Sequence, residues 1–107
     1  VLYTWAGPEI AVASTKAYTT QIIALYEIAL HMAHLKGTIT DEQIEHVKNE
    51  MTKLPDMIKE VLEHKETIQK FATRNSNARD MFYLGRGLDY AVALEGSLKM
   101  KEISYIH

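Results

Sequence analysis

Three charged residues near the end of the chain have the types and the spacing of a catalytic cluster. Glu95, Lys99 and Glu102 stand in the stretch ALEGSLKMKEI, residues 93–103. In a helix, which turns about 100° per residue, they would lie within roughly 60° of one another. A carboxylate on such a face could move a proton, while the ammonium stabilises developing negative charge. From spacing alone, an ordinary surface ion pair worth about 0.2–0.5 kcal/mol is the simpler explanation.

Gly96 stands inside the same predicted helix. Glycine in a helix interior costs about 1 kcal/mol relative to alanine, so its presence needs a reason such as a close approach by another part of the backbone. This glycine therefore slightly favours a functional reading of the charged face over a solvent-exposed ion pair.

Two turns could contact a ligand. Gly85-Arg86-Gly87 follows an apolar run and precedes the last helix, a layout typical of ligand-binding turns as well as of plain ones. The loop from Glu9 to Thr15 precedes another predicted helix, whose free N–H groups would attract anions or polar oxygens. Ser14 or Thr15 could equally do no more than cap that helix.

Metal, redox and nucleic-acid chemistry find little support in the composition. The chain has no cysteine, and none of its five histidines has a metal-ligand spacing, so neither a metal nor a cofactor is expected. The net charge of −2 gives no reason to expect nucleic acid or an anionic membrane as partner. A reducing cytoplasm is consistent with the lack of cysteine.

The elements that must position these residues are mostly helical. Helices are predicted over about 16–36, from Thr40 through a capping box with Gln43, over 56–72, and from about 88 to the end. Short buried strands are predicted at 1–4 and 81–84. A strand followed by a glycine-containing turn and a helix occurs twice, which is typical of a parallel α/β sheet.

The first predicted helix indicates that this chain does not form a complete structure alone. Its middle is apolar on most sides, so neighbouring elements must cover it, and the other predicted elements are too few. Both ends of the chain also lie inside predicted elements, and no residue after Ile103 is a helix stop signal. We therefore expect a piece of a larger enzyme that is inactive by itself and self-associates or is partly molten.

Two long stretches carry a resemblance to a known family. The stretch WAGPEIAVASTKAYTTQ, residues 5–21, and LGRG at 84–87 with ALEGSLKMKEISYIH at 93–107 resemble the isomerising glutamine–fructose-6-phosphate aminotransferases. This resemblance implies the sugar isomerase (SIS) fold, with paired flavodoxin-like α/β subdomains. Residues 1–37 would end the first subdomain, 38–80 would form a helical connection, and 81–107 would begin the second.

The resemblance also implies an activity and roles for individual residues. The family makes glucosamine 6-phosphate from fructose 6-phosphate and glutamine, using ammonia from a separate glutaminase domain, and is expected to be homodimeric. By position, Glu102 resembles the residue that shuttles a proton between C1 and C2, and Lys99 its partner. Glu95 resembles a supporting position, while Val12 and Ser14 resemble sugar-binding residues.

Two other readings stay open. Another SIS-domain enzyme, such as a fructosamine-phosphate deglycase, would share the proton transfer but lack the glutaminase domain. A non-catalytic SIS domain that senses sugar phosphates would not need the acid at position 102. An upstream glutaminase domain would discriminate the aminotransferase from the deglycase.

Overall fold

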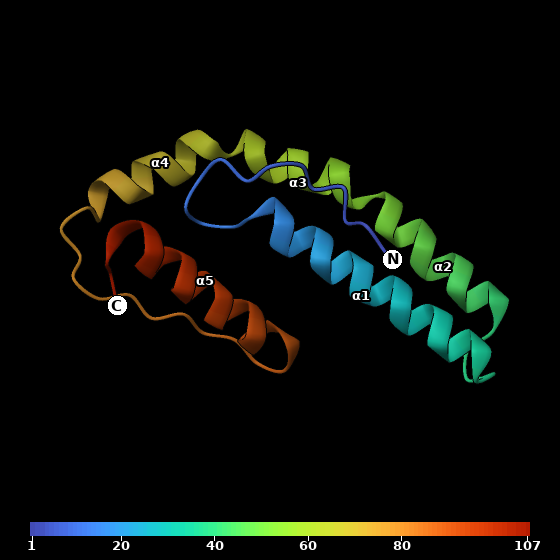
Figure 1. The fold of residues 1–107 in the computed structure, drawn as a ribbon. Helices are drawn as coiled ribbons and strands as arrows, with labels where there is room; N and C mark the ends of the chain where they lie inside the picture. The colour runs from blue at the N-terminus through green and yellow to red at the C-terminus, as the bar shows by residue number, and fades with distance from the viewer.

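The computed structural model describes all 107 residues and contains five helices. These are α1 (Lys16–Leu35), α2 (Asp41–Thr52), α3 (Leu54–Glu63), α4 (Lys65–Arg74) and α5 (Leu88–Ser104). Helices α2, α3 and α4 follow one another as a long, bent arm, with α2 packed against α1 (Figure 1). Helix α5 follows α4 through a long connection and runs beside an extended segment at 81–87 (Figure 1). The mostly helical character expected from the sequence is confirmed.

The boundary between α1 and α2 confirms two local predictions. Helix α1 ends at Leu35, and Gly37 adopts a positive φ of 64° where the chain turns. At the start of α2, the Gln43 N–H donates to Thr40 Oγ1 at 3.2 Å, and the Thr40 N–H donates to Gln43 Oε1 at 3.0 Å. This reciprocal pair is the predicted capping box, and it satisfies two N–H groups that the helix leaves free.

Removing the capping hydroxyl should loosen the start of α2. We expect Thr40→Ala to destabilise the first turn by about 1 kcal/mol, because the N–H of Gln43 loses its acceptor. Amide hydrogen exchange at Gln43 should then be about fivefold faster. Thr40→Ser keeps the hydroxyl and serves as the control; equal exchange in the two variants would contradict the cap.

The third predicted helix, over 56–72, is wrong as a single element. The structure divides it at His64, where φ is −84° and ψ is 10°. There the His64 N–H donates to the Val61 carbonyl and the Thr67 N–H to the His64 carbonyl, each only three residues back along the chain. These tighter turns bend the helix axis. Pro55 lies in the first turn of α3, where its missing N–H costs nothing.

The two predicted strands, at 1–4 and 81–84, are also wrong. Both segments lack strand pairing, and the side chains of Leu2, Phe82 and Leu84 are exposed instead of buried. A strand exists through hydrogen bonds with a neighbour, and neither segment finds one among these residues. The single backbone bond to the second segment is donated by Met81 N–H to the His107 carbonyl at 2.9 Å.

Helix α5 ends earlier than predicted. It was expected to continue to the end of the chain, but it stops at Ser104, and Tyr105 adopts the left-handed conformation with φ of 59°. The reversal at Tyr105 carries His107 back to its backbone bond with Met81. A tertiary contact therefore accompanies this stop, although the sequence there has no glycine, asparagine or proline.

The chain has almost no core. Only Ala13 and Leu30 are buried, and the accessible surface is 9505 Å², whereas a compact monomer of this mass exposes about 6,100 Å². The radius of gyration is 17.2 Å, against about 13 Å for a compact domain of this length. Along α1, Leu25, Tyr26 and Met32 are each at least half exposed, which agrees with the expectation that this helix needs neighbours. None of the five helices combines the length and apolarity needed to cross a membrane.

Candidate functional site

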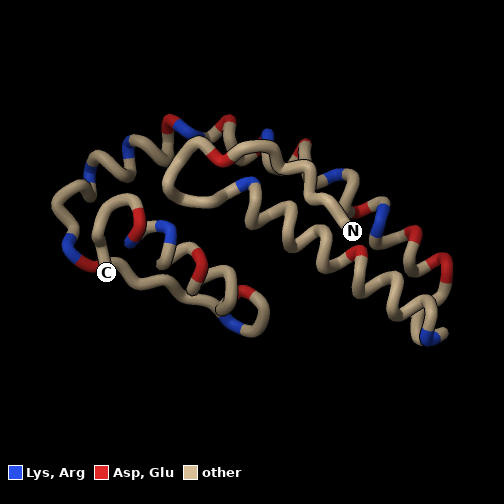
Figure 2. The backbone as a smooth tube through the Cα atoms, in the orientation of Figure 1, with Lys and Arg blue, Asp and Glu red and all other residues tan.

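The predicted charged face is present on α5. Lys99 Nζ lies 2.8 Å from Glu102 Oε2 and 3.5 Å from Glu95 Oε1. The three side chains are only 20%, 32% and 26% exposed for Lys99, Glu102 and Glu95 respectively. Both acidic and basic positions lie along this helix (Figure 2). The arrangement of acid, base and acid expected from the spacing is confirmed, with the shorter contact to Glu102.

The charge of Lys99 is fixed by this cluster. Its hydrogen bond to Glu102 holds the pKa of the Lys99 ammonium above the ordinary value of 10.5, the carboxylate charges of Glu102 and Glu95 add to the effect, and burial opposes it. At neutral pH the side chain is therefore an ammonium and cannot accept a proton. Because the folded pKa is raised, the stabilisation is fully present below 10.5 and is lost as the pH rises through the folded value.

The turn before α5 has a steric need for both of its glycines. A Cβ at Gly85 would collide with the backbone carbonyl of Asp89. Gly87 precedes α5 with φ of 62° and ψ of −125°, a conformation that a side chain strongly disfavours. Sterics thus account for the glycine pair without a ligand.

The loop before α1 is closed by an acidic residue that sequence reasoning missed. The Thr15 N–H donates to Glu9 Oε1 at 3.4 Å, and neither Ser14 nor Thr15 caps α1 with its side chain. Thr15 is the residue at the N-cap position, one of the two candidates, but its hydroxyl makes no capping hydrogen bond, so the capping by a side chain is not found. An acidic residue shortly before a helix start was the available signal. Within the loop, Val12 is exposed and Ser14 half-buried.

The structure does not join the two groups of candidate residues. Glu95, Lys99 and Glu102 form one cluster on α5. Val12 and Ser14 lie in the loop before α1, and no hydrogen bond or ion pair connects that loop to the cluster. That these residues form one site is implied by the resemblance alone, because no contact in this structure joins the two groups.

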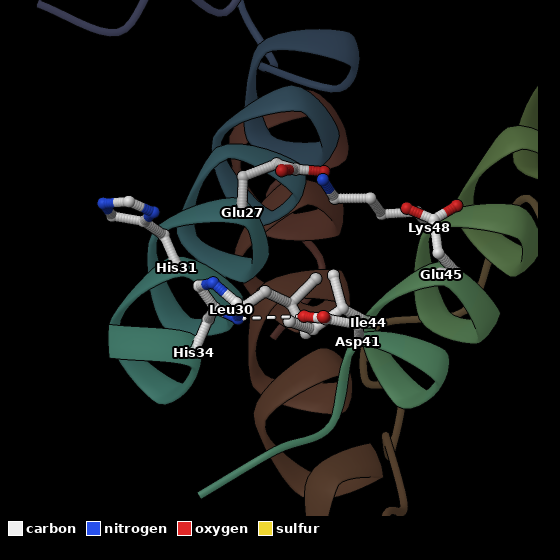
Figure 3. A pocket seen from close by; sticks show the side chains of 8 residues that line it. All are labelled: Glu27, Leu30, His31, His34, Asp41, Ile44, Glu45 and Lys48. Carbon is white, nitrogen blue, oxygen red and sulfur yellow. Dashed lines mark ion pairs between the residues drawn. The ribbon is translucent and has the colours of Figure 1, made fainter. Parts of the chain in front are cut away.

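A polar hollow, which was not predicted, lies between α1 and α2. Its volume is about 310 Å³, and it is lined by Glu27, Leu30, His31, His34, Asp41, Ile44, Glu45 and Lys48. His34 Nδ1 lies 3.2 Å from Asp41 Oδ1, whereas His31 points away from α2 (Figure 3). No three of the chain's histidine and carboxylate side chains are grouped so that they could hold a metal ion. The His34–Asp41 pair depends on the turn at 36–40, so sequence patterns could indicate only the spacing of the two histidines.

The known proteins similar to this chain include several isomerising glutamine–fructose-6-phosphate aminotransferases. The chain is 65% identical over all 107 residues to the glutamine–fructose-6-phosphate aminotransferase (isomerizing) of Caldanaerobacter subterraneus. It is 60% identical over 107 residues to that of Clostridium perfringens and 46% over 106 residues to that of Thermococcus kodakarensis. These matches confirm the resemblance seen in the two stretches. The chain spans about 18% of the length of each relative. No family model and no solved structure matches it.

Proposed function

We propose that this chain is a segment of the isomerase domain of an isomerising glutamine–fructose-6-phosphate aminotransferase. The observation that carries the proposal is the cluster of Glu95, Lys99 and Glu102 on α5, within a chain that is 65% identical throughout to one such enzyme. The parent would convert fructose 6-phosphate and glutamine to glucosamine 6-phosphate. We further propose the division at residues 37–38 and 80–81, and a cytoplasmic, homodimeric parent with its own glutaminase domain, as the resemblance implies.

In this proposal Glu102 is the group that moves the proton. Conversion of a 2-ketose to a 2-amino-aldose needs a proton taken from C1 and one delivered to C2, and a single carboxylate can do both. Lys99 cannot take this role, because its raised pKa keeps it protonated. The charge state of Lys99 leaves the two carboxylates as the possible bases of this cluster, and the resemblance assigns the role to Glu102.

Lys99 supplies positive charge beside the reacting carbons. Negative charge develops on the sugar oxygen or nitrogen when the proton leaves C1, and a fixed ammonium stabilises it. Glu95 contacts the same ammonium from the other side at 3.5 Å and so helps to hold it in place. Glu95 is thus proposed to act through Lys99 and not on the sugar.

Val12 and Ser14 are proposed to bind the sugar. The Ser14 hydroxyl can donate and accept hydrogen bonds with sugar hydroxyls, and it makes no hydrogen bond within the chain. Sugar binding would require that other parts of the parent bring this loop toward α5.

The test is the full-length enzyme carrying Lys99→Met. Wild type should form glucosamine 6-phosphate from fructose 6-phosphate and glutamine; the variant should lose about 10²–10³-fold in kcat for this reaction, because the stabilising charge is gone. Lys101→Met is the matched control, since Lys101 makes no ion pair on the same helix. Wild type without product, or equal effects of the two substitutions, would contradict the proposal.

A further inference from the structure

The glycine inside α5 lies against an aromatic ring. A Cβ built at Gly96 would stand 3.0 Å from Cε1 and 3.2 Å from Cδ1 of Tyr83. Such distances are shorter than ordinary van der Waals contact, so a side chain at position 96 would displace the ring or the helix backbone by a few tenths of an ångström. This contact supplies the reason for a residue that costs about 1 kcal/mol of helix propensity.

Tyr83 belongs to the extended segment that runs antiparallel to α5 (Figure 1). Met81 and Tyr83 are half-buried, whereas Phe82 and Leu84 are exposed, so alternate side chains of this segment face the helix. The segment is anchored at one end by the Met81–His107 backbone bond and at the other by the close approach of Gly85 to Asp89. The contact of the Tyr83 ring with Gly96 lies along the segment between these two anchored ends.

Gly96 lies next to the charged face. On the helix it is about 60° from Lys99 and about 100° from Glu95. A ring pressed on Gly96 therefore limits how far α5 can rotate about its own axis. With charged groups about 5–6 Å from that axis, a rotation of 10° displaces them by about 1 Å.

We propose that Tyr83 and Gly96 are positioning residues that set the rotation of α5 and thereby aim Glu102 and Lys99 at the substrate. This inference deepens the proposed function and rests on it. Misplacement of a catalytic group by about 1 Å can cost about 10²-fold in rate. A methyl group at position 96 would force either the ring or the helix to move.

The test uses full-length enzyme with Gly96→Ala, Tyr83→Val, and both together. Gly96→Ala should lower kcat for glucosamine 6-phosphate formation about tenfold to a hundredfold, with KM for fructose 6-phosphate within about twofold and glutamine hydrolysis unchanged. The double variant should recover to within about threefold of Tyr83→Val, because the smaller side chain makes room for the methyl group. Ser97→Ala, on the adjacent position, is the control and should keep its kcat.

Three outcomes would overturn the positioning role. Full kcat in Gly96→Ala shows that the ring does not limit the helix. A loss that the double variant does not recover, or one that falls on KM alone, shows that the contact does not aim the cluster. If Gly96→Ala does not fold, a folded and active double variant still supports the steric contact, and an unfolded one refutes it. Inactive wild type would instead refute the proposed function itself.

Discussion

Under the proposed function, Glu102→Gln in the full-length protein is expected to abolish formation of glucosamine 6-phosphate while glutamine hydrolysis continues. The amide keeps the shape of the side chain and can still accept the hydrogen bond from Lys99, but it cannot accept a proton from carbon. Loss of a general base costs about 10²–10⁴-fold. We expect the upper part of this range, because the neighbouring ammonium cannot replace the carboxylate.

Glu95→Gln is the matched control for this prediction. It makes the same chemical change on the same helix face, at the carboxylate that lies farther from Lys99 Nζ. Since Glu95 is assigned only to hold Lys99, its substitution should cost about tenfold or less. Initial rates of product formation and of glutamine hydrolysis distinguish the two roles. A larger loss in Glu95→Gln than in Glu102→Gln would mean that the roles are reversed.

What could be predicted from the sequence is what local physics decides. The capping box at Thr40, the end of α1 before Gly37 and the shared face of Glu95, Lys99 and Glu102 depend on residues within one or two helical turns. Periodicity and capping chemistry contain that information. These features are therefore the ones that the structure confirms.

The wrong predictions concern features that depend on other parts of the molecule. The strand at 81–84 would need a partner strand, and the stop at Tyr105 accompanies a backbone bond across to Met81. Thr15 stands at the N-cap of α1, but its hydroxyl makes no capping bond, and its own N–H donates to the Glu9 carboxylate six residues away. Such contacts join residues that sequence patterns treat as independent.

The candidate site divides in the same way. The α5 cluster follows from spacing, but its catalytic meaning came only with the resemblance. Val12 and Ser14 have no local signal that separates sugar binding from an ordinary loop, and no contact joins them to α5. By contrast, the glycine at position 96 was a local signal: it indicated a close approach to this part of the helix, and the structure places the Tyr83 ring there.

The isolated 107-residue chain is expected to associate and to melt without a sharp transition. Its accessible surface exceeds that of a compact monomer by about 3,400 Å², an area typical of an obligate interface. Part of this surface is an apolar hollow between α1 and α5, lined by Tyr18, Thr19, Ile22, Leu25, Tyr26, Ala29, Leu88, Ala91 and Val92. Water-exposed apolar surface of this extent favours association.

Sedimentation velocity and calorimetry on the isolated chain test this expectation. Association should appear as species larger than 12.2 kDa whose proportion rises with concentration. Replacing Leu25, which is 60% exposed and lines the hollow, with Lys should reduce it. Leu62→Lys is the matched control, because Leu62 is 63% exposed on α3 and lies outside the hollow. This substitution should reduce association less than Leu25→Lys. A monomer with a single cooperative transition would contradict the prediction, because two buried residues give too little core to make unfolding cooperative.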